Sequence, residues 1–428
     1  MGHDTGEKKL TTMMASAHII KAVMGAGSFA LPWAFTKSGI VLGPLILMAI
    51  AAMSAYTHIL LARCRRKASS YCAIHEMEHG GERQAKGMSP QEGHGALLPY
   101  TRTAEAVLGL WGGRIAVACT MCASVGVCSA YVVFITDNVC SCLSGECSDP
   151  PVRRGVTLVA VMGLVMLSWL RDLRRLAFTS TLGDFAIVTG GCVVMWFALF
   201  GDKGVRTDQE PIPAAVFSTM PLAYGAIAFL FCTQFLSLPI EGSMQHPEQW
   251  PLAVCVSFFL CAIFNSIFGV VGCHAWGTSV ESIVILNLPV GPMSHLVKLC
   301  LSADLFFTYP IVIFPSVELL ENNALVQLLM PPQGTREEYW AKNVLRAILV
   351  CLTALIAISV PHFGLLTDLF GGLGQTVLAF LVPPWMSMVL NKNLMQPNMW
   401  AIVAFGALSC VVTTSMSLAL LAEEVRNP

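Results

Sequence analysis

Residues 18–45 read HIIKAVMGAGSFALPWAFTKSGIVLGPL. This apolar run is long enough to cross a lipid bilayer, since a spanning helix needs about 20 apolar residues. Two glycines and a proline lie between Met24 and Pro32 and weaken the helix at mid-membrane. A break of this kind frees backbone N–H groups at the positive end of a half-helix, where a carboxylate can bind. Taken alone, the pattern favours the simpler interpretation that small residues allow close helix packing.

A second interrupted segment changes that balance. Residues 223–238 form another apolar run, which ends at Pro239 and carries Cys232, Thr233 and Gln234 in its middle. The two interrupted segments are the first and sixth spans of the chain, which correspond to each other in a five-plus-five inverted repeat. Paired interruptions at corresponding positions point to a binding site.

The whole composition is that of a membrane protein. Of the 428 residues, 55% are hydrophobic and 12% are charged, whereas a soluble domain carries about 25% charged residues. We predict an all-α membrane protein with a single transmembrane domain over residues 1–428, because helices satisfy their own backbone groups in lipid. The predicted spans, about 11 in number, centre near Met24, Ala51, Ser124, Met162, Val193, Phe229, Ile263, Phe306, Leu352, Leu378 and Leu408.

Basic residues give the predicted orientation. With 11 spans and a cytoplasmic N-terminus, most Lys and Arg clusters fall on the cytoplasmic side. Residues 68–98 are polar and are predicted to form a cytoplasmic loop, and residues 102–109 (RTAEAVLG) are predicted to form a short interfacial helix before the third span. The clusters are Lys8 and Lys9, Arg63 with Arg65 to Lys67, Arg171 with Arg174 and Arg175, Arg336 with Lys342 and Arg346, and Lys392.

Ionisable residues inside spans are functional candidates, because a charge in hydrocarbon is costly. Lys21 precedes the first break by one turn, and Asp304 lies inside the eighth span. One hypothesis is that Lys21 faces Asp304; the alternative is that Lys21 binds backbone carbonyls while Asp304 faces water. His18 could relay protons, or it could be a structural residue near the cytoplasmic interface. Asp184 and Glu318 are weaker candidates.

Several classes of function are not expected. Residues 75–79, HEMEH, match a zinc-protease signature, but their polar surroundings lack the apolar face that such a site requires. We therefore predict no enzyme activity, no metal site and no cofactor. Nucleic acid binding is not expected because no basic stretch is interleaved with aromatic residues. Cys140, Cys142 and Cys147 share a polar loop that could hold a disulfide.

The sequence resembles the amino acid/auxin permease family, and within it the proton-coupled amino acid transporter branch. The resemblance covers nearly the whole chain outside residues 69–99. It is carried by residues 18–45 together with TAEAVLGLWGG (103–113), LPIEGSMQHPEQWP (238–251), SIVILNLP (282–289), FFTYPIVIFPSVELLE (306–321) and LFGGLGQTVLAFLVPP (369–384).

The resemblance implies a leucine-transporter-type fold, with two inverted repeats of five helices and one C-terminal helix. It also implies that the broken first span holds a substrate carboxylate and that the broken sixth span meets the amine and side chain. This chain departs from the family pattern in the sixth span, where Cys232 and Thr233 replace the usual Glu and Gly. The implied binding residues are Gly25, Ala26, Gly27 and Ser28 in the first span, and Phe231, Cys232, Thr233 and Gln234 in the sixth.

Lys21 occupies a position where sodium-coupled relatives carry Asn, and an ammonium there opposes a sodium ion. The sequence therefore predicts a secondary transporter of small neutral amino acids that is proton-coupled and sodium-independent. Its partners are the amino acid, protons and the bilayer, in a plasma membrane or a vacuolar or lysosomal membrane. The alternatives are an amino-acid sensor, and an uncoupled facilitator or exchanger of other small zwitterions or organic anions.

Overall fold

A computed structural model describes most of the chain. The described residues are 10–84, 100–144, 150–170, 173–201, 212–332, 334–360, 362–393 and 395–426. Within these ranges, the description covers the backbone alone at residues 70–84, 144, 150, 173–184, 324–325 and 424–425. Predictions that fall outside the described residues or side chains concern Lys8, Lys9, His75, His79, residues 85–98, Cys147, Arg171, Arg174, Arg175 and Asp184.

The described residues form helices, and they contain no β-strand beyond one isolated bridge between Leu10 and Met244. The helices are α1 (Thr12–Val23), η1 (Ala26–Ala30), α2 (Leu31–Ser38), α3 (Leu42–Gln84), α4 (Tyr100–Ser144), α5 (Pro150–Ser168), α6 (Leu173–Phe200), α7 (Met220–Leu230), α8 (Gln234–Gly242), η2 (Pro247–Gln249), α9 (Trp250–Trp276), η3 (Gly277–Ser279), η4 (Val284–Asn287), α10 (Pro292–Glu321), α11 (Ala324–Leu329), α12 (Arg336–Ser359), α13 (Phe363–Phe370), η5 (Gly371–Gln375), η6 (Val377–Leu381), α14 (Val382–Leu390) and α15 (Pro397–Arg426).

The predicted spans are confirmed as helical segments. Among the described residues, nine helices are long and apolar enough to cross a membrane, and the bent pair α1 and η1–α2 makes a tenth. The remaining predicted centre, Val193, lies in α6, whose apolar part over Phe185–Phe200 is shorter. The other centres fall in their own segments: Met24 lies at the bend after α1, and Leu378 lies in the irregular stretch between α13 and α14.

Two features of the polar connection between α3 and α4 follow from the structure. The predicted loop over residues 68–98 begins as a helix, because α3 continues to Gln84. A separate short helix before the third span is present as predicted, because Gly109 has φ 75° and ψ −170° and separates it from the rest of α4. A positive φ of this size suits glycine.

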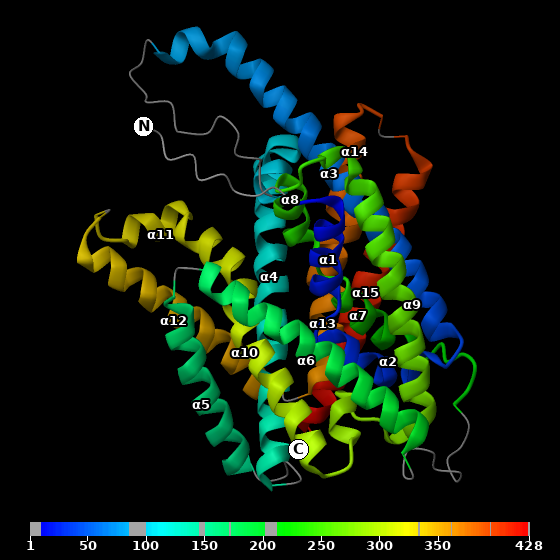
Figure 1. Ribbon diagram of the computed structural model, residues 1–428. Helices are drawn as coiled ribbons and strands as arrows, with labels where there is room; N and C mark the ends of the chain where they lie inside the picture. Colours follow the sequence, from blue (N-terminus) through cyan, green and yellow to red (C-terminus); the bar gives the residue numbers. More distant parts are fainter. Residues whose placement is uncertain are drawn as a thin grey trace.

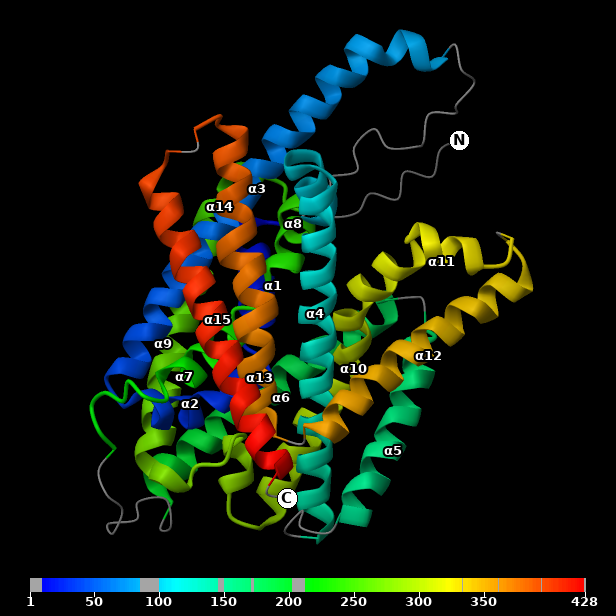
Figure 2. The ribbon, with the colours of Figure 1, turned by 180° about the vertical axis from the view of Figure 1, so that it is seen from behind.

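The helices pack into one bundle (Figure 1). α1 and α7 lie inside it, α9 packs against α1, α2 and α3, and α10 packs against α4 and α6. The views from front and back show α5 and α12 at one side and α3, α9 and α15 at the other (Figures 1 and 2). α1 begins at the end of the bundle where α8 ends, which we name the N-terminal face. α15 ends at the opposite end, the C-terminal face.

Candidate substrate-binding site

The first span is broken at Met24 and Gly25. α1 ends at Val23, Met24 has φ −82° and ψ 76°, and the helix resumes at Ala26 with its axis bent by 45°. The Gly25 N–H donates to Val23 O at 3.0 Å, and the Ser28 N–H donates to Gly25 O at 3.0 Å. The first residues of the new helix, Ala26 and Gly27, have no preceding turn to accept their N–H groups, so these groups are placed to receive an anion.

The second break lies directly beside the first. α7 ends at Leu230, and α8 resumes at Gln234 after three residues of irregular backbone. A Cβ placed on Gly27 would lie 3.4 Å from Leu230 Cα, whereas a Cβ on Gly25 would meet nothing within 4 Å. Gly27 therefore lets the two broken helices approach closely, and Gly25 borders open space.

That open space is a cavity of about 410 Å³. It brings together seven of the residues singled out from the sequence: His18, Lys21, Gly25, Ala26, Gly27, Cys232 and Asp304. The sequence did not point to the apolar and hydroxyl-bearing residues that complete its wall, which come from α4, α6, α7, α8 and α10. Among these are Val127, Tyr131, Ile187, Phe229, Phe235 and Thr308.

Four residues implied by the family resemblance are placed elsewhere and do not line this cavity. Phe231 stacks on Phe258 with ring centroids 5.3 Å apart. Thr233 Oγ1 lies 3.0 Å from His58 Nε2, and Gln234 is hydrogen-bonded to Gln375. Ser28 is buried, and its hydroxyl oxygen has no hydrogen-bond partner. Three of these side chains therefore join α7 and α8 to neighbouring helices.

Opposite charges line the cavity from two helices. Lys21 on α1 and Asp304 on α10 both border it, and Asp304 is only 5% exposed. The Thr308 hydroxyl, one turn along α10, donates to Asp304 Oδ1 at 3.3 Å. His18 is exposed and lies one turn closer to the N-terminal face than Lys21. Glu318 is exposed and is not among the lining residues, so it does not contribute to the cavity wall.

The cavity extends toward the N-terminal face. Its lining reaches Ile240, two residues before α8 ends. On the other side of the breaks, four buried phenylalanines pack together. Phe29 lies 6.3 Å from Phe134 and 5.8 Å from Phe268, and Phe134 lies 5.7 Å from Phe363, measured between ring centroids. None of them is among the residues that line the cavity, and Phe29 lies in η1, just after the first break. We name these four residues the aromatic plug.

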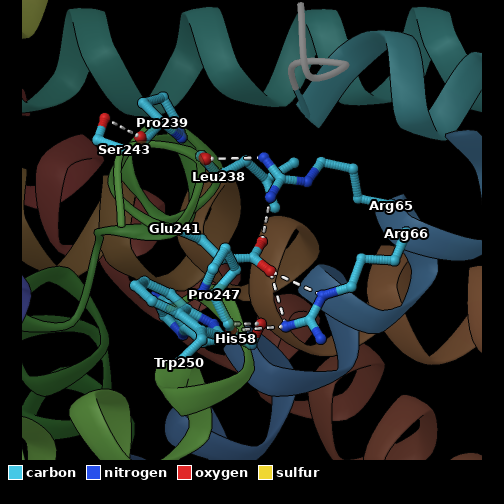
Figure 3. Close-up of polar contacts among 9 residues, drawn as sticks. All are labelled: His58, Arg65, Arg66, Leu238, Pro239, Glu241, Ser243, Pro247 and Trp250. Carbon is cyan, nitrogen blue, oxygen red and sulfur yellow. Dashed lines mark hydrogen bonds and ion pairs between the residues drawn. The ribbon is translucent and has the colours of Figure 1, made fainter. Parts of the chain in front are cut away.

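An ionic cluster ties α8 to α3 at the N-terminal face (Figure 3). Glu241 is fully buried and is paired with Arg65, whose Nη1 also donates to Leu238 O at 2.8 Å. Arg66, which is 44% exposed, donates through Nε to the other carboxylate oxygen of Glu241 at 2.9 Å. The Arg66 Nη2 reaches Pro247 O at 3.1 Å. One carboxylate therefore joins two consecutive arginines to the exit of the broken sixth span.

Solved structures share this arrangement of helices. A manganese transporter mutant from Eremococcus coleocola matches with a TM-score of 0.53 and 13% identity, over 98% of this chain and 87% of that chain. MhsT in complex with L-phenylalanine matches with a TM-score of 0.52 and 11% identity, over 96% of this chain and 100% of that chain. The fold is therefore the leucine-transporter type.

The family follows from the sequence comparison. The chain belongs to the family described as transmembrane amino acid transporter protein, which matches residues 8–422. Amino acid transporter AVT3C of Arabidopsis thaliana is 26% identical over 427 residues, covering 94% of this chain and 89% of the relative. Amino acid transporter AVT1C of the same plant is 25% identical over 419 residues, covering 95% of this chain and 69% of the relative.

Proposed function

We propose that the chain is a secondary active transporter that carries small neutral amino acids, couples their movement to protons and works without sodium. The observation that carries this proposal is the cavity between the two helix breaks, which holds an ammonium and a carboxylate from different helices. Membership of the amino acid transporter family supports the substrate class. Alternating access would move the helices around this site.

The groups around the cavity suit a zwitterion with a small apolar side chain. The N–H groups at Ala26 and Gly27 suit the substrate carboxylate. The last residue of α7, Leu230, and the irregular backbone at Cys232 border the cavity and offer backbone carbonyls for the amine. Val127, Phe229 and Phe235 give an apolar wall, which disfavours a charged substrate side chain because an unpaired charge there would lose its hydration.

The coupling part of the proposal rests on charge. An ammonium at Lys21 repels a sodium ion at close range. A proton binds directly to a carboxylate oxygen, so proton coupling needs no separate ion site. Asp304 and His18 line the same cavity as Lys21. We propose that Lys21, Asp304 and His18 respond to proton binding during the cycle.

The proposed orientation places the N-terminus in the cytoplasm, as the positive-inside rule favours. The cavity would then extend toward the cytoplasm, and the aromatic plug would close the outer or lumenal side. The membrane is proposed to be the plasma membrane or a vacuolar or lysosomal membrane.

Uptake into proteoliposomes tests the proposal. Labelled alanine and proline are supplied outside the vesicles under an inward proton gradient, and separately under an inward sodium gradient. We expect uptake driven by protons alone, and we expect Lys21→Met to abolish it while Lys392→Met, in the exposed turn after α14, does not. Stimulation by sodium would overturn the coupling assignment. Binding without uptake or exchange would instead support the amino-acid sensor.

A further inference from the structure

Asp368 on α13 is a buried carboxyl group outside the cavity just described. It is 0% exposed, and neither of its oxygens has a hydrogen-bond partner of normal geometry among the described residues. An ionised carboxylate in such a place is much less favourable than a neutral one, because it loses its hydration without gaining a close ion-pair partner in the described part of the chain. The neutral acid is the form that this environment accommodates.

The carboxyl group lies at the junction of three spans. A Cβ on Gly225 of α7 would lie 2.5 Å from Asp368 O, so the backbones of α7 and α13 touch here. A Cβ on Gly372 would lie 2.7 Å from Thr413 Cγ2 of α15. α13 and α15 run in opposite directions. Asp368 precedes Gly372 by one turn and Ser417 follows Thr413 by one turn, so Asp368 and Ser417 lie at the same level of the bundle. The hydroxyl oxygen of Ser417 is also buried without a partner.

A polar cavity approaches Asp368 from the C-terminal face. It measures about 510 Å³ and is lined by residues that include Lys37, Glu281, His362 and Glu423. We name it the vestibule. Gly364 and Leu365, one turn before Asp368, line it, and so does Leu420, about one turn beyond Ser417. The vestibule therefore ends about one helical turn from the buried carboxyl group.

The charges around Asp368 leave it without an ion-pair partner. Lys37 lies over the Trp33 ring at 5.4 Å, and that ring packs against Gly364. The Lys37 nitrogen forms no hydrogen bond with the Asp368 carboxylate. The other titratable groups on the helices packed against Asp368 are engaged elsewhere. Tyr224 of α7 is hydrogen-bonded to Thr376, with Cys410 of α15 near it, and Asp137 of α4 pairs with Arg153. His362 and Glu423 line the vestibule.

We propose that Asp368 is a proton-binding site of the transport cycle, loaded from the vestibule and holding its proton while buried. In the proposed step, a hydronium ion in the vestibule transfers one proton to the Asp368 carboxylate. One O–H bond of the hydronium ion breaks and leaves a water molecule, one O–H bond forms on the carboxyl oxygen, and one negative charge is neutralised. The neutral acid then allows α13 to close against α7 and α15. The coupling role rests on the proposed function, whereas the proton binding itself does not.

The chemistry favours a proton over a metal cation. A sodium ion needs several oxygen ligands at once, and the vestibule through which it would arrive is lined by the cation Lys37. A proton needs only the carboxyl oxygen. The site is separate from Lys21 and Asp304, which border the other cavity.

Exchange and net uptake distinguish this role from a structural one. Asp368→Asn keeps the shape of a neutral acid but cannot release a proton. The matched control is Glu337→Gln, at an exposed position in the first turn of α12 and outside the vestibule. We expect Asp368→Asn to exchange labelled alanine across vesicles at nearly the wild-type rate. Its net uptake driven by a proton gradient should fall by about tenfold, as expected for loss of a typical coupling free energy. Glu337→Gln should retain both activities.

Infrared difference spectra give a second readout that does not need transport. Wild-type protein at neutral pH should show the C=O band of a protonated buried carboxyl group, and Asp368→Asn should lack it. Gradient-driven uptake that survives in Asp368→Asn, absence of the band in the wild type, or failure of Asp368→Asn to fold would each overturn the assignment. A wild-type protein without exchange or uptake that still shows the band would refute the proposed transport function and leave the proton site in place.

Discussion

Gly25 is the residue at which the first helix break meets the cavity. A methyl group there would project into open space rather than into protein, because no atom lies within 4 Å of its Cβ position. Gly25→Ala should therefore fold normally and narrow the site. We expect KM to rise by about tenfold for the larger of two substrates, since a misplaced methylene costs about 1–3 kcal/mol in a snug pocket.

The matched control for Gly25→Ala is Gly155→Ala. Gly155 also has open space around its Cβ position, but it lies on α5 and does not line the cavity. Uptake kinetics of alanine and proline measure the effect, and thermal unfolding confirms the fold. Equal KM values for wild type and Gly25→Ala would show that the substrate does not approach this backbone.

The relation between Lys21 and Asp304 is a second test at the residue scale. Both border the same cavity, as the pairing hypothesis requires. If they form a pair, removing one leaves the other as an uncompensated charge, so each single alanine variant should lose most of its transport. Lys21→Ala combined with Asp304→Ala should lose little more, with a coupling free energy of about 0.5–3 kcal/mol. Losses in uptake that simply add would contradict the pairing.

The site could be predicted from the sequence only where a helix break or an ionisable residue inside a span carries the signal. Gly25 and Gly27 stand out because glycines and a proline interrupt an apolar run. Tyr131 and Phe235 also line the cavity, but each lies in an apolar segment, where an aromatic residue facing the site cannot be told from one facing a neighbouring helix. Asp368 did have a signal, a carboxyl group in an apolar run, but it lies near the boundary of a span.

At the scale of the helices, the two breaks work because other elements hold their ends. Leu10, just before α1, accepts a hydrogen bond from the Gln245 N–H at 2.8 Å and donates its own N–H to Ser243 O at 2.7 Å. The start of α1 is therefore bonded to the segment that follows α8. α8 is in turn held to α3 by Glu241. The sequence predicted the breaks but not these ties, because they join residues more than 170 positions apart.

The two arginines that bind Glu241 allow a sharp stability test. Arg65 is 3% exposed in its side chain and Arg66 is 44% exposed, yet both contact the same carboxylate. Arg65→Gln should cost about 3–5 kcal/mol of unfolding free energy, because it leaves a buried charge poorly compensated. Arg66→Gln should cost about 0–1 kcal/mol, because water screens an exposed pair.

Thermal unfolding of the purified protein compares the two variants directly. Each variant is the control for the other, since the substitution and the carboxylate partner are the same. A large difference in melting temperature is expected, with Arg65→Gln the less stable. Similar melting temperatures would show that Glu241 is hydrated rather than buried between α3 and α8.

At the scale of the whole molecule, the two sides of the helix breaks differ: the cavity lies on one side and the aromatic plug on the other. The lining of the cavity runs from the helix breaks to Ile240 near the N-terminal face. Phe29, Phe134, Phe268 and Phe363 occupy the opposite side. The number of spans could be predicted from apolar length alone, but this asymmetry could not. It depends on which helix faces meet in one of the two arrangements that a transporter adopts.

Cys232 offers a natural reporter of that asymmetry. It lines the cavity as a free cysteine and is 9% exposed. A small membrane-impermeant thiol reagent should reach it from the N-terminal face, whereas the aromatic plug should block approach from the C-terminal face. A bound amino acid should slow the reaction, because Cys232 borders the proposed position of its amine.

Labelling of vesicles sorted by orientation measures this prediction, with Cys232→Ser as the control that subtracts reaction at the other cysteines. We expect modification that depends on Cys232 from one side only, and protection by alanine. Equal labelling from both sides would contradict a closed plug. One-sided labelling without protection would keep the conformation but move the substrate away from the sixth-span break, because a ligand held there would cover the thiol.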